Sequence, residues 1–147
     1  EEGLKAVPGN FVDMNGKVLG THKGIIHYTI GQRKGLGLAM GHPVFVVDII
    51  PETNEVVIGE NADTFSKELI ADKTNFMSVE RPEDGMQVIG KIRYAHKGAP
   101  CRIYMLDADR VRVVFDEPVR AATKGQAVVF YEDDHIVGGG TIKEIIR

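Results

Sequence analysis

The sequence predicts an all-β protein with only minor short helices. Runs of β-branched residues are short, polar turn residues separate them at even spacing, and no long apolar stripe with a helical period is present. Short, evenly spaced strands are typical of barrels and sandwiches. The chain has 147 residues, of which 43% are hydrophobic, and this length suits one average domain or two small ones.

Four hairpins account for most of the predicted strands. In each of them, two apolar runs flank a group of polar turn residues, and Asn15 with Gly16 is the strongest two-residue turn signal. The other three turns are predicted at residues 51–54, 107–110 and 132–134. Helical signals are weaker, and we expect only one or two turns within residues 25–30 and a short turn within residues 61–69.

A change in composition near residues 73–79 predicts a domain boundary. The first domain, residues 1–74, is Gly-rich with a long loop, and the second, residues 75–147, has strands at steady spacing. Within the second domain, the three consecutive glycines at 138–140 predict close backbone packing or a bulge. The chain begins at Glu1 without an initiator Met, so we expect it to be a piece of a longer protein.

Composition excludes several classes of protein. The net charge of −3 argues against a polybasic nucleic-acid binder, although it permits a local basic patch. The lone cysteine, Cys101, can form neither an intramolecular disulfide nor a cysteine-cluster metal site, and this fits a reducing compartment. Apolar runs such as residues 44–47 are too short to cross a bilayer, and no signal peptide is visible. We therefore expect a cytoplasmic protein.

The charges are unevenly distributed along the chain. No acid lies between Asp13 and Asp48 or between Asp84 and Asp107, whereas residues 48–90 contain ten acids and three bases. One alternative is that these segments are ordinary solvated strand faces. The other is that the acid-free windows face a polyanion. In the second window, strand alternation places Lys91 and Arg93 on the same face, which suits contact with an RNA backbone.

The strongest nucleic-acid signal is the run Lys91, Ile92, Arg93, Tyr94. Two cations on one side of a strand, with an aromatic ring near its end, suit an RNA backbone and one stacked base. Residues 31–37 form a second, Gly-rich basic segment that includes Arg33 and Lys34. This segment lacks both the phosphate-binding P-loop ending and dinucleotide-fold spacing, so contact with a larger anion and a purely structural loop remain the alternatives.

No catalytic or metal-binding set emerges from the residues. His22 and His27 lie five positions apart with no third ligand nearby, and they are interpreted as structural or surface histidines. Cys101 has no fixed histidine partner and is interpreted as an inert small hydrophobe.

Seven runs of residues together resemble the central and C-terminal domains of the tRNA-specific 2-thiouridylase family, in the right order. The run Tyr-Thr-Ile-Gly-Gln-Arg-Lys-Gly-Leu-Gly at residues 28–37 is the most specific. One departure is Lys124, where the family usually has a proline before Gly-Gln; it is a turn position, so we expect no functional loss. The matching runs lie at residues 8–13, 19–24, 28–37, 91–94, 115–119, 122–131 and 138–142.

The resemblance implies a parent enzyme that replaces oxygen with sulfur at C2 of the wobble uridine. In that family an N-terminal domain binds ATP and adenylates the uridine, and two cysteines deliver and resolve a persulfide. Neither the nucleotide loop nor those cysteines match any part of this chain, and Cys101 does not correspond to them. The resemblance therefore implies no catalytic, cofactor-binding or metal-binding residue here, and a fragment inactive on its own.

The resemblance also implies a fold and a binding site. The second domain should be a six-stranded β-barrel similar to those of translation factors, and Arg93, Tyr94 and Gln126 match positions used for tRNA contact. With Lys91, Arg33 and Lys34 they form the predicted RNA-binding set. The expected partners are tRNA and a sulfur-carrier protein, and not DNA or a membrane.

The alternative hypothesis is a structural or protein-interaction β module. Such a module would position the catalytic domain or receive the sulfur carrier through the acidic block at residues 48–90. Glu52, Glu55 and Glu60 would then contribute to the partner face.

Overall fold

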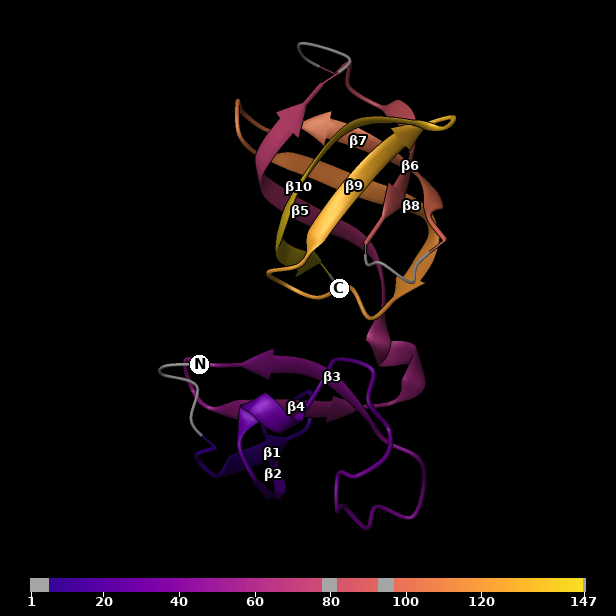
Figure 1. The fold of residues 1–147 in the computed structure, drawn as a ribbon. Coiled ribbons are helices and arrows are strands. Elements are labelled where there is room, and N and C mark those ends of the chain that lie inside the picture. Colours follow the sequence, from indigo (N-terminus) through magenta and orange to yellow (C-terminus); the bar gives the residue numbers. More distant parts are fainter. Residues whose placement is uncertain (1–5, 78–81, 93–96, 147) are drawn as a thin grey trace. The chain divides into compact units, whose positions relative to one another are not determined.

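A computed structural model describes residues 6–77, 82–92 and 97–146 and divides the chain into two compact units, Glu1–Phe65 and Ser66–Arg147 (Figure 1). Both units are built from β-strands, so the predicted all-β class is confirmed. The division falls earlier than the predicted boundary between residues 74 and 75. The reason is strand β5, Phe65–Phe76, which pairs with the last strand of the chain and so belongs to the second unit.

The first unit is a four-stranded sheet in the order β2-β1-β4-β3. Its two hairpins are antiparallel, and β1 lies parallel to β4 between them. Two 3-10 helices occur where short helical turns were expected, one after β2 and one after β4. The elements are β1 (Gly9–Val12), β2 (Val18–His22), η1 (Ile25–His27), β3 (Phe45–Ile50), β4 (Glu55–Gly59) and η2 (Asn61–Thr64).

An aromatic cluster fixes the core of the first unit. The rings of Phe11, His22 and Tyr28 meet edge to face in all three pairs, with centroids 5.3 to 5.7 Å apart. The backbone N–H of Gly24 donates to His22 Nδ1 (2.9 Å), so Nε2 carries the proton and donates to the Asn54 carbonyl (2.8 Å). His22 is thus a buried, neutral, structural histidine.

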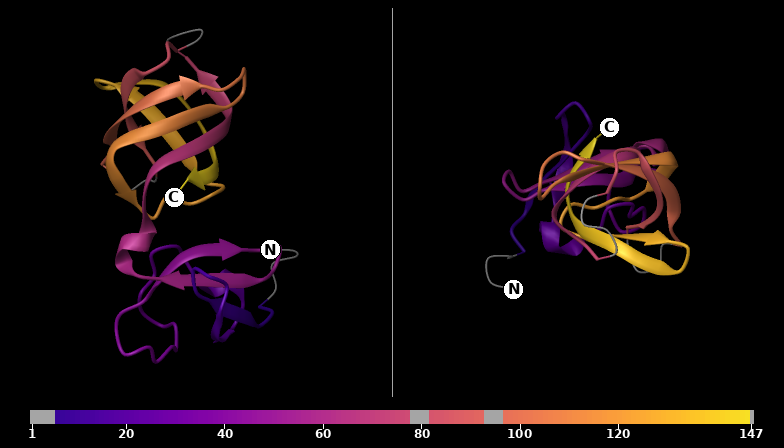
Figure 2. Two further views of the ribbon diagram at one scale, coloured as in Figure 1. Left: turned by 180° about the vertical axis from the view of Figure 1, so that it is seen from behind. Right: turned by 90° about the horizontal axis from the view of Figure 1, so that it is seen from above.

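The second unit is a closed six-stranded barrel in the order β10-β5-β8-β7-β6-β9 (Figures 1 and 2). Both predicted hairpins are present, as β7–β8 and β9–β10. Large apolar side chains fill the interior, including Phe115, Ile103 and Phe130, all fully buried. The remaining strands are β6 (Met86–Lys91), β7 (Ala99–Met105), β8 (Val111–Arg120), β9 (Ala127–Glu132) and β10 (His135–Ile146).

The three consecutive glycines lie where β10 crosses closely over its neighbours. The register of β10 shifts on both sides of this run, so the predicted bulge is present. A Cβ on Gly138 would lie 2.4 Å from Cδ1 of Phe76, whose ring stacks on Phe130 at a centroid distance of 6.0 Å. Only glycine allows this approach, and the aromatic stack closes the barrel at this point.

Candidate nucleic-acid interface

Strand β6 alternates between the barrel interior and solvent, as its sequence predicts. Val88, Gly90 and Ile92 are buried, whereas Ile89 and Lys91 are half-buried on the outer face. Lys91 is the last residue of β6 and lies opposite Val129 of β9. The predicted contacts Arg93 and Tyr94 lie outside the described residues.

Gln126 lies in the turn that leads into β9. Its backbone N–H donates to the Thr123 carbonyl (3.2 Å), and its carbonyl accepts from the N–H of Ile142 on β10 (2.8 Å). The neighbouring N–H of Gly125 donates back to the Ile142 carbonyl (2.8 Å). These bonds fix the backbone while the side chains of Gln126 and Lys124 remain exposed.

The fold brings Lys91 and Gln126 to the same end of the barrel. Strands β6 and β9 are antiparallel, so the end of β6 lies beside the start of β9. Gln126 precedes the partner of Lys91 by three residues, which is roughly 10 Å along a strand. Lys97 is exposed just before β7, whose first residue pairs with Gly90. We call this surface the lysine end, formed by Lys91, Lys97, Lys124 and Gln126.

The segment at residues 31–37, here called the basic loop, is held at three points. The N–H of Gly31 donates to the Val46 carbonyl (2.7 Å), and the N–H of Val46 donates to the Gln32 carbonyl (2.9 Å). Leu36 is buried in the core of the first unit. Between these anchors, Arg33 and Lys34 are exposed. The loop therefore presents two cations on a fixed backbone, which lowers the entropic cost of binding a polyanion.

The side chain of Gln32 supports the basic loop from within. Its Oε1 accepts from the N–H of Thr29 (2.9 Å), and its Nε2 donates to the carbonyl of Lys34 (2.8 Å). These two bonds tie the side chain of Gln32 to the backbone on both sides of Arg33, at Thr29 and at Lys34. Gln32 is therefore a positioning residue for the two cations.

We expect the Gln32→Ala variant to loosen the basic loop without unfolding the unit. The amide of Thr29 loses its acceptor and should exchange with solvent about fivefold to tenfold faster, as expected for one hydrogen bond of about 1 kcal/mol. Amide hydrogen exchange followed by NMR measures this. Gln32→Glu keeps the acceptor for Thr29 and is the matched control. Equal exchange rates in the wild type and the Ala variant would contradict the role of Gln32.

The structure supports neither a nucleophilic role for Cys101 nor a metal site among the described residues. Cys101 is fully buried, and desolvation, reinforced by the charge of Asp116, raises the pKa of its thiol to about 12. The thiol therefore stays protonated at neutral pH and is no nucleophile. Within the described ranges, no group of His, Cys, Asp and Glu side chains could hold a metal ion. In the same ranges, no helix has the length and apolar character needed to cross a membrane.

The acidic block at residues 48–90 is divided by the fold. Its acids up to Asp63 belong to the first unit, and those from Glu68 onwards belong to the barrel. Within the first unit, Glu55 accepts from Thr53 Oγ1 (2.8 Å), and Glu60 lies 3.4 Å from His42. The block is thus continuous in sequence, but its acids are divided between the two units.

Sequence reasoning missed three contributors to these surfaces. Lys124 was considered only as a departure from a family pattern, and Lys97 was not singled out within its acid-free window. The signal for both was their position beside predicted strand ends. The role of Gln32 depends on loop geometry, and no sequence signal indicates it.

Two family models match the chain, the tRNA methyl transferase PRC-barrel domain over residues 1–60 and the aminomethyltransferase β-barrel domain over residues 66–142. The tRNA-specific 2-thiouridylase MnmA of Lachnoclostridium phytofermentans is 61% identical over 140 residues, which cover 95% of this chain and 39% of that protein. The protein of the same name from Clostridium botulinum strain Alaska E43 is 58% identical over 138 residues, 94% of this chain and 38% of that protein.

A relative from Clostridium perfringens with the same name is 54% identical over 142 residues, 97% of this chain and 40% of that protein. The chain therefore spans about two fifths of the length of these curated relatives. Both units are matched by a family model, and the relatives match almost the whole chain. The chain belongs to the tRNA-specific 2-thiouridylase family and corresponds to its central and C-terminal domains.

Proposed function

We propose that this chain is the tRNA-binding, non-catalytic part of an ATP-dependent tRNA 2-thiouridylase. The parent enzyme replaces oxygen with sulfur at C2 of the wobble uridine. The observation that carries the proposal is the lysine end of the barrel, where three lysines and an exposed amide gather on a fixed backbone. Its chemistry suits a phosphate backbone, and the relatives are named for a reaction on tRNA.

Each residue of the predicted RNA-binding set has a distinct role in this proposal. Lys91 and Arg93 neutralise phosphates, and the ring of Tyr94 stacks on a nucleotide. The amide of Gln126 forms a hydrogen bond at the rim of the barrel, where it offers both a donor and an acceptor. On the first unit, Arg33 and Lys34 contact phosphates of the same tRNA.

The remaining chemistry belongs to the part of the parent enzyme that this chain does not match. That part binds ATP, supplies the cysteines and receives sulfur from a carrier protein. The chain itself binds no cofactor, and its role is to hold the substrate while another domain reacts with it. The parent enzyme acts in the cytoplasm, where its tRNA substrates are found.

A salt titration of tRNA affinity tests the proposal. In the full-length enzyme, Arg93→Ala removes one phosphate contact and should lower the slope of log affinity against log salt by roughly 0.7–0.9. The matched control is Arg110→Ala, which removes an exposed arginine from the opposite end of the same barrel. If Arg93→Ala leaves both slope and affinity at the wild-type values, the Arg93 assignment is wrong.

A further inference from the structure

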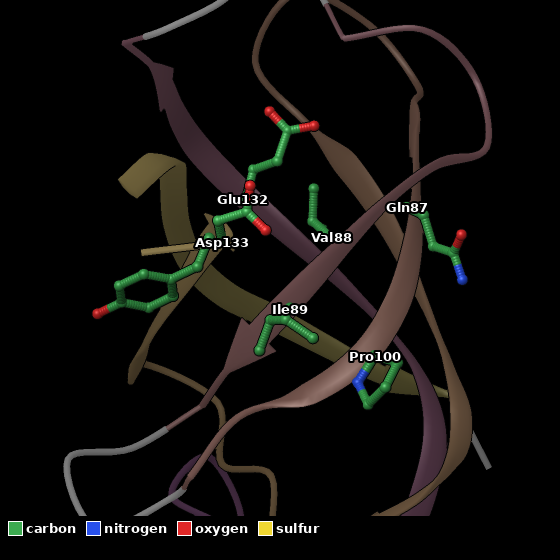
Figure 3. A pocket seen from close by; sticks show the side chains of 7 residues that line it. Gln87, Val88, Ile89, Pro100, Glu132 and Asp133 are labelled. Carbon is green, nitrogen blue, oxygen red and sulfur yellow. The ribbon is translucent and has the colours of Figure 1, made fainter. Parts of the chain in front are cut away.

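A groove opens in the barrel wall between strands β6 and β9 (Figure 3), and it extends from Ile89 in the direction away from Lys91. It has a volume of about 330 Å³. Its walls combine apolar side chains with two carboxylates. The lining residues are Gln87, Val88, Ile89, Pro100, Tyr131, Glu132 and Asp133.

The groove begins where the pairing of β6 with β9 ends. Their pairing extends from Lys91 opposite Val129 to Ile89 opposite Tyr131 and goes no further along these described strands. Beyond that point, β6 continues to pair with β7 on its other side, and the end of β9 pairs with β10. Because β9 ends at Glu132, the open strand edge beside the groove is that of β6 from Met86 to Val88. Open strand edges accept an extended peptide through its backbone.

The floor of the groove is apolar. Ile89 lies opposite Pro100 on one side and opposite Tyr131 on the other, so the three form a row across strands β7, β6 and β9. Ile89 and Tyr131 are half-buried, and Pro100 is exposed. A side chain lying across this row would bury apolar surface that is now in contact with water.

The charge around the groove is negative. Glu132, Asp133 and Asp134 are exposed in the β9–β10 hairpin, and Glu83 and Asp84 are exposed just before β6 starts at the same end of the barrel. Among the described cations, Arg102 lies opposite Gln87 and donates to the Gly85 carbonyl (3.0 Å), and Arg110 pairs with Asp107 (2.8 Å). Such a rim repels phosphate and attracts Lys or Arg side chains.

We propose that this groove docks an extended segment of a separate partner protein in which basic and apolar side chains alternate. The apolar side chain lies on Ile89, and the cation lies between the carboxylates of Glu132 and Asp133 and the ring of Tyr131. The barrel then has two ends of opposite character, one for tRNA and one for a protein. This site uses none of the residues assigned to tRNA contact.

An NMR titration of this chain tests the groove, with a capped pentapeptide of alternating arginine and leucine as the probe. We expect saturable amide shifts centred on Gln87, Ile89, Tyr131 and Glu132, weakening as salt rises. A pentapeptide of alternating glutamate and leucine should give no such shifts. If the arginine peptide shows no saturable binding, or its shifts lie elsewhere, the proposal is wrong.

Neutralising Glu132 and Asp133 tests whether the groove recognises the charge of the peptide or only its apolar side chains. The double variant Glu132→Gln, Asp133→Asn keeps the shape of both side chains, and Asn tolerates the positive φ of 55° at position 133. We expect about fivefold weaker peptide binding. The matched control is Asp116→Asn, Glu117→Gln, two exposed acids of β8 on the same barrel. Equal weakening in both variants, or groove shifts caused by a short RNA oligonucleotide, would overturn the proposal.

Discussion

Gly138→Ala is expected to lower the free energy of unfolding of the barrel by about 2–4 kcal/mol, as overpacking in a closed core does. The added Cβ would lie 2.4 Å from Cδ1 of Phe76 and 2.6 Å from the carbonyl oxygen of Asn75. Because one of these atoms is backbone, rotation of a side chain cannot relieve the contact. Strand β10 would have to move away from β5, which opens the closed barrel.

The measurement is urea unfolding followed through amide signals of barrel residues such as Val128. Residue-specific signals are needed because the chain has two units, and one transition does not describe both. Gly125→Ala is the matched control. Gly125 has a positive φ of 91°, unlike Gly138, but no atom lies within 4 Å of its added Cβ, so only backbone strain of about 1 kcal/mol is expected. Similar losses in both variants would show that steric packing at Gly138 is not the cause.

The local elements were readable from the sequence, but their distant pairings were not. All four hairpins follow from turn chemistry between neighbouring runs, which acts over a few residues. The pairing of β5 with β10 joins residues more than 60 positions apart, from Gly138 with Phe76 to Ile146 with Glu68. No local pattern in β5 indicates that it pairs with β10. The predicted boundary therefore placed most of this strand outside the barrel domain.

The candidate site was likewise only partly predictable from the sequence. Charge counting found Lys91, Arg33 and Lys34, because the acid-free windows are continuous in sequence. The acidic rim of the groove was not found, because hairpin and turn residues from separate segments meet only when the barrel closes. A continuous run of charge in the sequence also need not belong to one unit, since the acidic block at residues 48–90 is divided between the two units.

The largest effect on tRNA binding is expected when both basic surfaces are removed together. In the full-length enzyme, Arg33→Ala with Lys34→Ala removes the cations of the basic loop, and Lys91→Ala with Lys124→Ala removes two from the lysine end. Each pair should weaken tRNA binding about tenfold and lower the salt slope by roughly 1.4–1.8, since each cation contributes 0.7–0.9. The fourfold variant should bind about a hundredfold more weakly, with a slope lower by roughly 3.

This cycle tests whether both units hold one tRNA at the same time. If they do, the surfaces contact different phosphates, their effects multiply, and their slopes add. If only one surface binds, the fourfold variant should be no weaker than the more damaging pair. The control pair Arg102→Ala, Arg110→Ala removes two exposed arginines of the barrel that lie away from Lys91 and Lys124; Arg102 donates to the Gly85 carbonyl (3.0 Å) and Arg110 pairs with Asp107 (2.8 Å). It should leave the slope near the wild-type value, because the slope counts cations that contact phosphates and the proposal assigns no such contact to these arginines. A control slope that falls as far as the others would mean that tRNA senses only the net charge of the protein, and a shaped interface would be excluded.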